Sequence, residues 1–332
     1  MNSLSTCKVT IVGLGLMGGS LALALRGQCA EVIGVDVDPA TIEYAQRQAI
    51  IDRAVGVDAP LDCDVLVLAI PVRAILNQLR QLSRSEIPLR LPLSDLPLEG
   101  RGAARRASGT VVINQKSTLI IDLGSTKRDI LAAMNDLPKH FDPIGGHPLC
   151  GKESSGIASA AADLFRGATF VLSPLPRTSP RALALAQQLV AAIGAHPLLL
   201  DAEQHDRWVA VTSHLAYLLA CVLVNTAERL NARAVWRLVA SGFRDTSRLA
   251  ASDVTMMGDI LRTNRPRILD ALSAGRAELD RLAALIESQD EAALRAALSH
   301  TQQRRAQLFT TQPASNEQLE YEDAVVDLWP GA

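Results

Sequence analysis

The chain has 332 residues, which is enough for two domains with separate hydrophobic cores, and 48 % of them are hydrophobic. Such a composition excludes a chain that is disordered throughout. Lys and Arg number 33 against 35 Asp and Glu, a net charge of −2, and aromatic residues make up only 3 %. Without a basic surface for phosphates or many rings for stacked bases, nucleic acid is not an expected partner.

The five cysteines form no CxxC pair, and their odd number argues against a disulfide framework and against a zinc site. The uncharged run 9–25 is interrupted by four glycines and precedes no clear cleavage site, so a signal peptide is not expected. The next apolar run, 215–224, is too short to span a bilayer. These features predict a cytoplasmic protein with no membrane partner and no metal.

The first half of the chain alternates between strand-like and helix-like segments. Compact apolar runs predict strands at 8–13, 31–36, 64–70, 118–123 and 168–172. Helical patterns lie between the first three, at 14–26 and 39–48. Strands that are apolar throughout and separated by helices indicate an α/β fold, with a doubly wound, mostly parallel Rossmann-type sheet covered on both faces.

The stretch 84–116 breaks this alternation with three prolines and a basic cluster of Arg101, Arg105 and Arg106. No helical or strand period persists through it, which predicts a long surface insertion. An ordered subdomain is the alternative, because loops of this length are seldom without structure.

The second half has helical spacing only. Apolar residues recur with a helical period over 208–230, 232–241, 254–263, 266–288 and 290–309. These helices carry more apolar surface than a small bundle hides, which predicts a homodimer. We expect a nucleotide-binding domain at 1–202, a helical substrate and dimerisation domain at 203–310, and a disordered acidic tail at 311–332.

A G-x-G-x-x-G run, with glycines at Gly13, Gly15 and Gly18, follows the first predicted strand and opens the first predicted helix. In a dinucleotide-binding unit the first glycine permits the tight turn, the second admits the pyrophosphate, and the third lets helix and strand pack closely. Asp36 ends the next predicted strand, where an acid bonds the ribose hydroxyl of NAD and repels the extra phosphate of NADP. The run therefore predicts an NAD site, and a glycine-rich turn without nucleotide is the alternative.

Two segments further on could carry chemistry. Ser125 follows a predicted strand and would lie at the carboxyl edge of the sheet, although a plain helix cap explains it equally well. His147 stands in a Gly-Gly-His-Pro loop, and an imidazole can accept a proton near neutral pH. His214, before an apolar helix, is either a pocket residue or a buried, satisfied imidazole. Arg248 is suited to gripping a carboxylate, or to a salt bridge between domains.

Together these segments resemble the prephenate/arogenate dehydrogenase family over about residues 7–83 and 117–310. The motifs that carry the resemblance are, in chain order, GLGLMGGSLALAL, VIGVD, LAIPV, DLGSTK, GGHPLCGKESSG, HDRWVAVTSHL and ASGFRDTSRLA. The GFRDTSR segment is most similar to cyanobacterial arogenate dehydrogenases. The resemblance implies an NAD-dependent oxidative decarboxylation of prephenate to 4-hydroxyphenylpyruvate in tyrosine biosynthesis, with arogenate as the alternative substrate.

The resemblance also implies roles for particular residues. His147 would accept the proton of the substrate 4-hydroxyl, and Ser125 would orient His147 and touch the nicotinamide. Arg248 would bind a substrate carboxylate, while His214 and Glu153 would line the same pocket. The nucleotide would contact Gly13, Gly15, Leu16, Met17, Gly18, Asp36, Ala69, Ile70, Pro71 and Ser125.

Three features depart from the family pattern. The insertion at 84–116 is unusual, Lys152 stands where a small polar residue is more common, and Met257 replaces a tryptophan of many prephenate-using members. Two other functions stay open at this point. One is another dehydrogenase with a Rossmann domain and a helical dimer domain, and the other is a dinucleotide-sensing module that would need neither His147 nor Arg248.

Overall fold

A computed structural model describes residues 3–57, 59, 62–84, 117–152 and 154–310. Contacts divide the chain into two compact units, 1–272 and 273–332. The insertion predicted at 84–116 lies, but for Arg84, outside the described residues, as does the predicted tail at 311–332. The domain boundary expected after residue 202 stays a prediction, since the first unit continues through the helices as far as Leu272.

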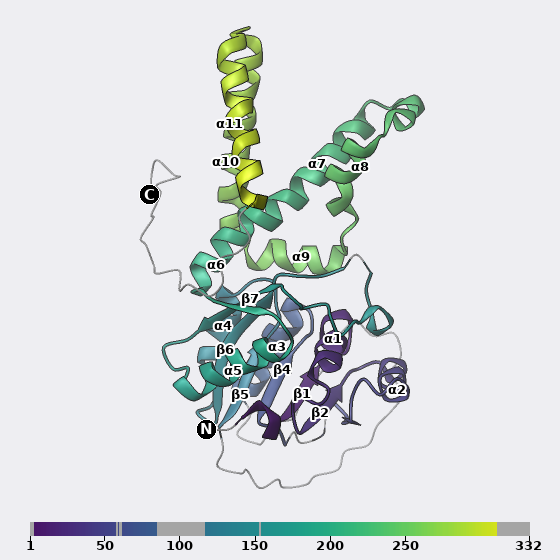
Figure 1. The fold of residues 1–332 in the computed structure, drawn as a ribbon, viewed down its shortest axis with the longest axis vertical. Coiled ribbons are helices and arrows are strands. Elements are labelled where there is room, and N and C mark those ends of the chain that lie inside the picture. The colour runs from purple at the N-terminus through teal and green to yellow at the C-terminus, as the bar shows by residue number, and fades with distance from the viewer. Residues whose placement is uncertain (1–2, 58, 60–61, 85–116, 153, 311–332) are drawn as a thin grey trace. The chain divides into compact units, whose positions relative to one another are not determined.

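The first unit is built on an eight-stranded sheet (Figure 1), with the strands in the order β3-β2-β1-β4-β5-β6-β7-β8. All neighbouring strands are parallel except β6 and β7. The first six strands have the order of a dinucleotide-binding fold, in which β2 and β3 lie on one side of β1 and β4 to β6 lie on the other. The strands are β1 (Lys8–Val12), β2 (Glu31–Val35), β3 (Arg53–Ala54), β4 (Val65–Leu68), β5 (Thr118–Asp122), β6 (Phe141–Pro148), β7 (Thr169–Pro174) and β8 (His196–Leu199).

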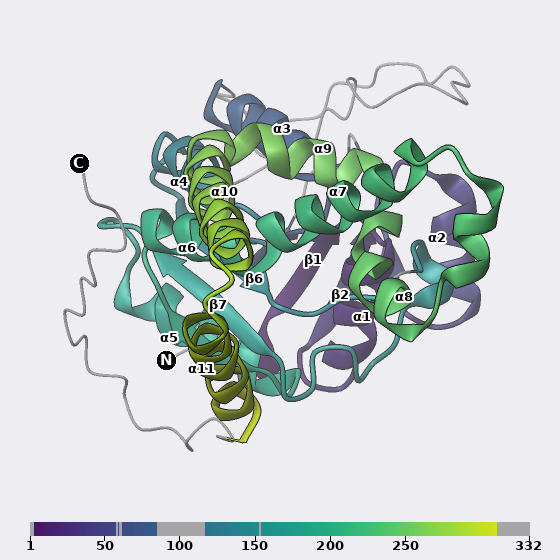
Figure 2. The same cartoon turned by 90° about the horizontal axis from the view of Figure 1, so that it is seen from above.

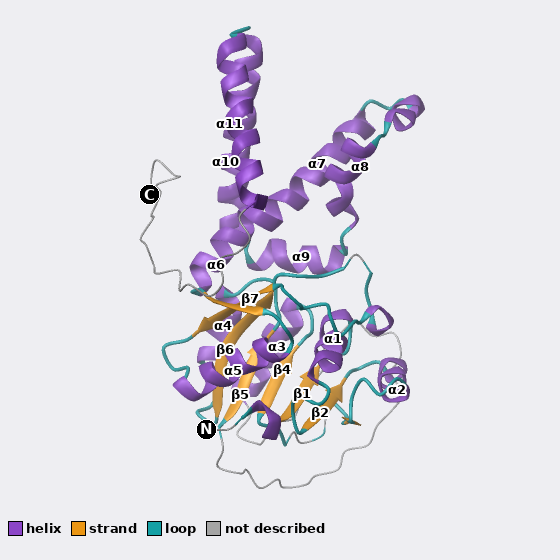
Figure 3. Ribbon diagram, viewed as in Figure 1, coloured by secondary structure: helices purple, strands orange, loops and turns teal. Residues whose placement is uncertain are grey.

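Helices cover both faces of this sheet (Figure 3). The alternation of side chains along β4 shows why its sequence is apolar throughout: Val65 and Val67 join one hydrophobic cluster, and Leu66 and Leu68 join the other. The first cluster includes α1 (Leu16–Leu25) and α5 (Pro180–Ala192), and the second includes α3 (Val72–Arg84) and α4 (Arg128–Asn135). The doubly wound, mostly parallel sheet predicted from the sequence is confirmed.

Only helices follow β8 among the described residues, as predicted. The series begins with α6 (Ala202–Val209), a π-helical turn η3 (Ala210–Leu215) and α7 (Ala216–Arg229). It continues with η4 (Arg233–Leu238), α8 (Ser241–Ser247), η5 (Arg248–Ala251), α9 (Val254–Thr263), α10 (Arg265–Glu287) and α11 (Glu291–Thr310). Helix α9 packs on α3 (Figure 2), where the Asp259 carboxylate accepts a hydrogen bond from the Arg73 backbone N–H at 3.2 Å.

The structure corrects two local predictions. The helix expected over 232–241 is a short 3₁₀ segment, η4, and α8 begins only at Ser241. The loop expected around His147 is a strand, β6, which pairs with β5 on one side and β7 on the other. Glycine and proline are poor strand formers, but the two neighbouring ladders outweigh that local preference here.

The longest apolar helix spans Ala202–Arg229 without a break, including its π-helical turn. Among the described residues it is the one helix long and apolar enough to cross a membrane by length and composition, and 22 % of its most apolar window is buried. It is longer than the run 215–224 on which the sequence argument rested. Its exposed large apolar side chains are Trp208, Val211, Leu219 and Val222. Since these recur at helical spacing, they form one apolar face suited to association with another surface.

Candidate active site

The glycine run forms a tight turn between β1 and α1. Gly13 has a φ of +89°, and a side chain there would come within 2.6 Å of the Ala69 carbonyl oxygen. A Cβ on Gly18 would overlap the carbonyl oxygen of Gly13, so α1 approaches the turn as closely as the motif predicted. A Cβ on Gly15 would meet nothing within 4 Å. The turn therefore leaves its middle glycine facing open space at the N-terminus of α1, where backbone N–H groups attract phosphates.

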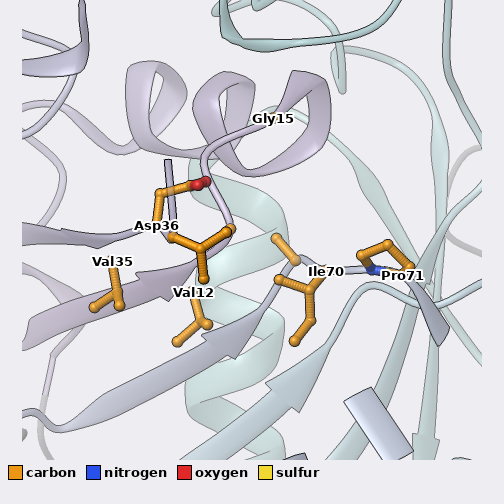
Figure 4. A pocket seen from close by; sticks show the side chains of 9 residues that line it. Val12, Gly15, Val35, Asp36, Ile70 and Pro71 are labelled. Atoms are coloured by element: carbon orange, nitrogen blue, oxygen red, sulfur yellow. The ribbon is translucent and has the colours of Figure 1, made fainter. Parts of the chain in front are cut away.

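A cavity of about 210 Å³ lies at this turn (Figure 4). Six of the predicted cofactor residues line it: Gly13, Gly15, Asp36, Ala69, Ile70 and Pro71. Its other lining residues are Val12, Val35 and Val37. Leu16, Met17 and Gly18 form the first turn of α1, and neither they nor Ser125 belong to the lining. The cavity joins the turn after β1 with the ends of β2 and β4, as a dinucleotide site requires.

Asp36 is held at the end of β2 by two backbone hydrogen bonds. Its Oδ2 accepts from the Leu14 N–H at 2.7 Å, and its Oδ1 accepts from the Asp38 N–H at 2.9 Å. The neighbouring Val37 side chain is exposed and apolar, so it offers no charge to a phosphate. A carboxylate fixed in this place accepts ribose hydroxyls and repels a ribose phosphate. Together, the open Gly15 and the fixed Asp36 fit NAD.

His147 lies at the same edge of the sheet as this cavity. Strands β1, β2, β4, β5 and β6 run parallel, so their carboxyl ends share one edge of the sheet. The predicted site residues at or just after these ends are Gly13, Asp36, Ile70, Ser125 and His147. Strand β6 is three places from β1, a distance of roughly 14 Å at about 4.8 Å per strand. In open α/β sheets ligands bind along this edge.

The imidazole of His147 is half-buried and belongs to a chain of hydrogen bonds. Its Nδ1 lies 2.8 Å from Nε2 of His205, whose Nδ1 lies 2.8 Å from Oδ1 of Asp206. His205 and Asp206 are buried residues of α6. Sequence reasoning missed both, although they stand at the start of the HDRWVAVTSHL motif. The available signal was a His-Asp pair just before the helix predicted at 208–230, and its role shows only once the strand with His147 lies beside it.

Asp206 also receives two backbone hydrogen bonds at the start of α4. Its Oδ1 accepts from the Lys127 N–H at 2.7 Å, and its Oδ2 accepts from the Arg128 N–H at 3.0 Å. Burial raises the pKa of Asp206, but the hydrogen bonds from His205 and from these two N–H groups outweigh burial, and the net pKa is lowered. Asp206 is therefore an ionised carboxylate that is hydrogen-bonded to His205.

A buried ion pair supports the strand that carries His147. The Lys127 ammonium and the Asp122 carboxylate form an ion pair in which neither side chain is exposed. Asp122 also accepts hydrogen bonds from the N–H groups of Gly124, at 2.8 Å, and Gly146, at 3.1 Å. Removing either charge would leave the other buried and unpaired, at a cost of about 3–5 kcal/mol. The DLGSTK motif thus anchors the residue next to His147.

The surroundings of His147 keep it neutral. Burial lowers the pKa of His147 well below its usual range, and His205, Lys127 and His214 lower it further by electrostatic repulsion of a second positive charge. A neutral imidazole is the form that can accept a proton.

His214 joins the same network from the π-helical turn η3. Its Nδ1 lies 3.3 Å from Nδ2 of Asn264, and that amide donates to the Asp206 backbone carbonyl at 2.7 Å. Burial lowers the pKa of His214 to about 4, with Asp206 raising it and His205 lowering it. The sequence left two possibilities for His214, and the structure shows a buried imidazole with a polar partner. His214 also lies in a π-helical turn, a feature that is common at functional sites.

The remaining predicted site residues are less closely tied to His147. Ser125 is half-buried, and its hydroxyl forms no hydrogen bond with another described residue. Arg248 begins η5, which packs against α7, and is exposed. Glu153 lies outside the described residues. The roles of Ser125, Arg248 and Glu153 stay predictions, as does the convergence of Arg248 and His147 on one ligand.

Two family models together match most of the chain. Residues 21–90 and 109–199 match the nucleotide-binding domain of prephenate dehydrogenase. Residues 201–300 match the prephenate dehydrogenase dimerisation domain.

Named relatives agree with the family models. The prephenate dehydrogenase of Bacillus subtilis (strain 168) is 30 % identical over 290 residues, which cover 85 % of this chain and 71 % of that protein. The structure of prephenate dehydrogenase from A. aeolicus in complex with hydroxyphenyl propionate and NAD⁺ has a TM-score of 0.76 and 27 % identity, covering 92 % of this chain and 100 % of that one. Synechocystis arogenate dehydrogenase has a TM-score of 0.72 and 27 % identity, covering 91 % and 99 %.

Proposed function

The chain belongs to the prephenate dehydrogenase family and is an NAD-dependent oxidoreductase, and we propose that it converts prephenate to 4-hydroxyphenylpyruvate. The observation that carries the proposal is a neutral, half-buried His147 at the sheet edge that also holds the Gly13–Gly18 turn. A proton acceptor beside a nicotinamide site is what the oxidation of a ring alcohol requires.

The reaction divides between the cofactor and the protein. Gly13, Gly15 and Asp36 would hold NAD⁺, which would supply the acceptor for the hydride that leaves C4 of the cyclohexadiene. His147 accepts the proton of the C4 hydroxyl, so that the O–H electron pair forms the carbonyl. The electrons of the C1–carboxylate bond then enter the ring as carbon dioxide leaves, and the resulting phenolate oxygen takes a proton back from His147. Aromatisation supplies much of the driving force, so the protein mainly orients the substrate and moves this proton.

The other predicted residues have supporting parts in the proposal. Arg248 would bind a substrate carboxylate, since a guanidinium pairs with it through two parallel hydrogen bonds. His214 would line the pocket from the helical segment that follows α6, and Glu153 would lie near its mouth. Ser125 would contact the nicotinamide and help to orient His147.

Arogenate is the second candidate substrate, because the chain is also similar to Synechocystis arogenate dehydrogenase. The two substrates differ only in the side chain, a pyruvyl group in prephenate and an amino acid in arogenate. Met257, at the position of a tryptophan in many prephenate-using members, is buried in a hydrophobic cluster with Ala210 and Ile260. Because its side chain packs in this core, we expect its effect on substrate choice to be indirect.

A side-by-side assay tests the proposed reaction. Purified protein is mixed with prephenate or arogenate and with NAD⁺ or NADP⁺, and NADH or NADPH is followed by its absorbance. We expect the highest kcat/KM with prephenate and NAD⁺. A higher kcat/KM with arogenate would make arogenate the substrate in place of prephenate. If neither substrate yields reduced cofactor, the proposed reaction is wrong.

We also propose that the active protein is a cytoplasmic homodimer, with a nucleotide-binding domain at 1–202 and a helical domain at 203–310. The exposed apolar face of Trp208, Val211, Leu219 and Val222 lies within the match to a dimerisation domain and supports this assembly. Val222→Glu should convert the dimer to monomer in light scattering. Glu228→Lys, an exposed charge change on the same helix, should not, and a wild-type monomer would refute the dimer.

A further inference from the structure

The residues around His147 form a directed chain whose far end is a carboxylate. Asp206 can only accept hydrogen bonds when ionised, so the contact at 2.8 Å requires His205 to donate from Nδ1. A neutral His205 then presents the lone pair of Nε2 to Nδ1 of His147, 2.8 Å away. His147 must therefore carry its own proton on Nδ1, which leaves the lone pair on Nε2.

We propose that His205 and Asp206 are positioning residues that hold His147 in the tautomer with a bare Nε2, the only form able to take the substrate proton. The inference rests on the proposed reaction for its kinetic consequence, but the tautomer itself is a property of the free protein. Neither residue needs to touch the substrate or the cofactor. Their action is to select one of the two neutral forms of an imidazole.

The backbone makes this arrangement rigid. Asp206 is fixed by the N–H groups of Lys127 and Arg128, and its own carbonyl accepts from the Asn264 side chain. His205 has no exposed surface, and the two imidazole rings meet edge to face at an interplanar angle of 74°. Since water cannot reach His205, no solvent molecule can replace it as the partner of Nδ1.

The chain also affects the proton affinity of His147. When His147 becomes an imidazolium, its Nδ1–H still donates to neutral His205, which passes the stabilisation on to the Asp206 charge. The titratable and charged groups around this imidazole are His205 and Asp206 on α6, Lys127 before α4, and His214 in η3. His205, Lys127 and His214 oppose protonation of His147 electrostatically, and the hydrogen bond that its Nδ1–H donates through His205 toward Asp206 works against them.

Nitrogen NMR of protein labelled with ¹⁵N-histidine tests the tautomer without any substrate. The chain has six histidines, and His147→Gln identifies the signals of His147. We expect a protonated Nδ1 and an unprotonated Nε2 in the wild type. A proton on Nε2 would overturn the proposal, whether or not the protein turns over prephenate.

Kinetics of two His205 variants test the consequence. His205→Leu keeps the volume but removes the acceptor, and should lower kcat by about 10–100-fold, as loss of an orienting partner does. The Kd for NAD⁺ and the KM for substrate should stay within about twofold, because neither His205 nor Asp206 needs to touch these ligands. His205→Gln offers an amide oxygen to Nδ1 of His147 and should restore most of kcat.

Asp206→Asn gives a third measurement. An asparagine NH₂ turned toward His205 would reverse both tautomers, and we expect kcat to fall by about 10²–10⁴-fold. If the Asp206→Asn variant unfolds because two backbone hydrogen bonds are weakened, the His205 variants still test the positioning role. An unchanged kcat in His205→Leu, or a kcat that His205→Gln does not restore, would refute the positioning role. A wild type that reduces NAD⁺ with neither substrate would refute the proposed reaction alone, since the NMR result is independent of it.

Discussion

Gly18 lies against the carbonyl oxygen of Gly13 so closely that a single added carbon would overlap it. Gly15, in the same run, has no atom within 4 Å of where its Cβ would be. The two glycines therefore serve different purposes. One allows the helix to pack on the strand, and the other leaves room for a ligand.

This difference gives a matched pair of variants. Gly18→Ala should destabilise the protein by about 1–3 kcal/mol, because the added carbon forces the helix and the turn apart. Gly15→Ala should keep the melting temperature of the free protein and raise the Kd for NAD⁺ at least about tenfold, about 1.4 kcal/mol. Thermal unfolding and calorimetric titration separate the two effects. Equal loss of stability in both variants would contradict this account.

Asp36 should set the choice between NAD and NADP. Asp36→Asn keeps an acceptor for the Leu14 N–H but removes the charge that repels a ribose phosphate. We expect the ratio of kcat/KM for NADP⁺ to that for NAD⁺ to rise roughly tenfold or more. Asp38→Asn is the control, since Asp38 caps α2 (Pro39–Arg47) and asparagine caps equally well. If the NADP⁺ to NAD⁺ ratio of kcat/KM rises as much in Asp38→Asn, Asp36 does not set the cofactor choice.

His147→Asn should lower kcat by roughly 10²–10⁴-fold, as expected for loss of a proton acceptor. Binding of NAD⁺ should change little, because His147 is not among the residues that line the cavity at the glycine turn. His140→Asn, a change in a half-buried histidine just before the same strand, should leave kcat within about twofold. Full activity of the His147→Asn variant would show that the mechanism is wrong even though the family is right.

Arg248→Ala should act mainly on substrate binding. Loss of a charged hydrogen bond to a carboxylate costs about 1.5–3 kcal/mol, which corresponds to a KM about 10–100-fold higher. Arg248→Lys should recover only part of this, because an ammonium cannot make the two parallel hydrogen bonds. Arg244→Ala, in the preceding helix α8, serves as control. A change in kcat with an unaltered KM would argue against carboxylate binding by Arg248.

The buried His214 should make stability depend on pH. Burial lowers the pKa of His214 to about 4, against about 6.5 in an unfolded chain. Between these values the unfolded chain binds more protons, so the free energy of unfolding falls as the pH falls from about 6.5 to about 4. The contribution of this one group is on the order of 3 kcal/mol.

Urea unfolding at several pH values measures this dependence. His214→Asn should flatten part of it, and His147, whose pKa is also lowered, should account for a further part. His300→Asn, at an exposed histidine, should leave the dependence as it is in the wild type. A stability that rises toward pH 5 would contradict the assigned burial.

Much of the fold follows from local sequence. The strands β1, β4 and β5 were predicted because each is a continuous apolar run, as strands covered on both faces must be. Strand β6 was not, because Pro143, Gly145 and Gly146 disfavour a strand, and its pairing with β5 and β7 exists only after folding. The cofactor turn was predictable for the opposite reason, since its geometry is set within six consecutive residues.

The sequence by itself determined the glycine turn, the acid proposed to bind the ribose, and the candidacy of His147. Only the tertiary structure decided what holds His147, because its partner His205 is 58 residues further along the chain. Spacing rules describe groups on one helix or strand, where the backbone sets their separation. Hydrogen bonds between distant segments depend on how the sheet and the helices pack, and no local pattern records them.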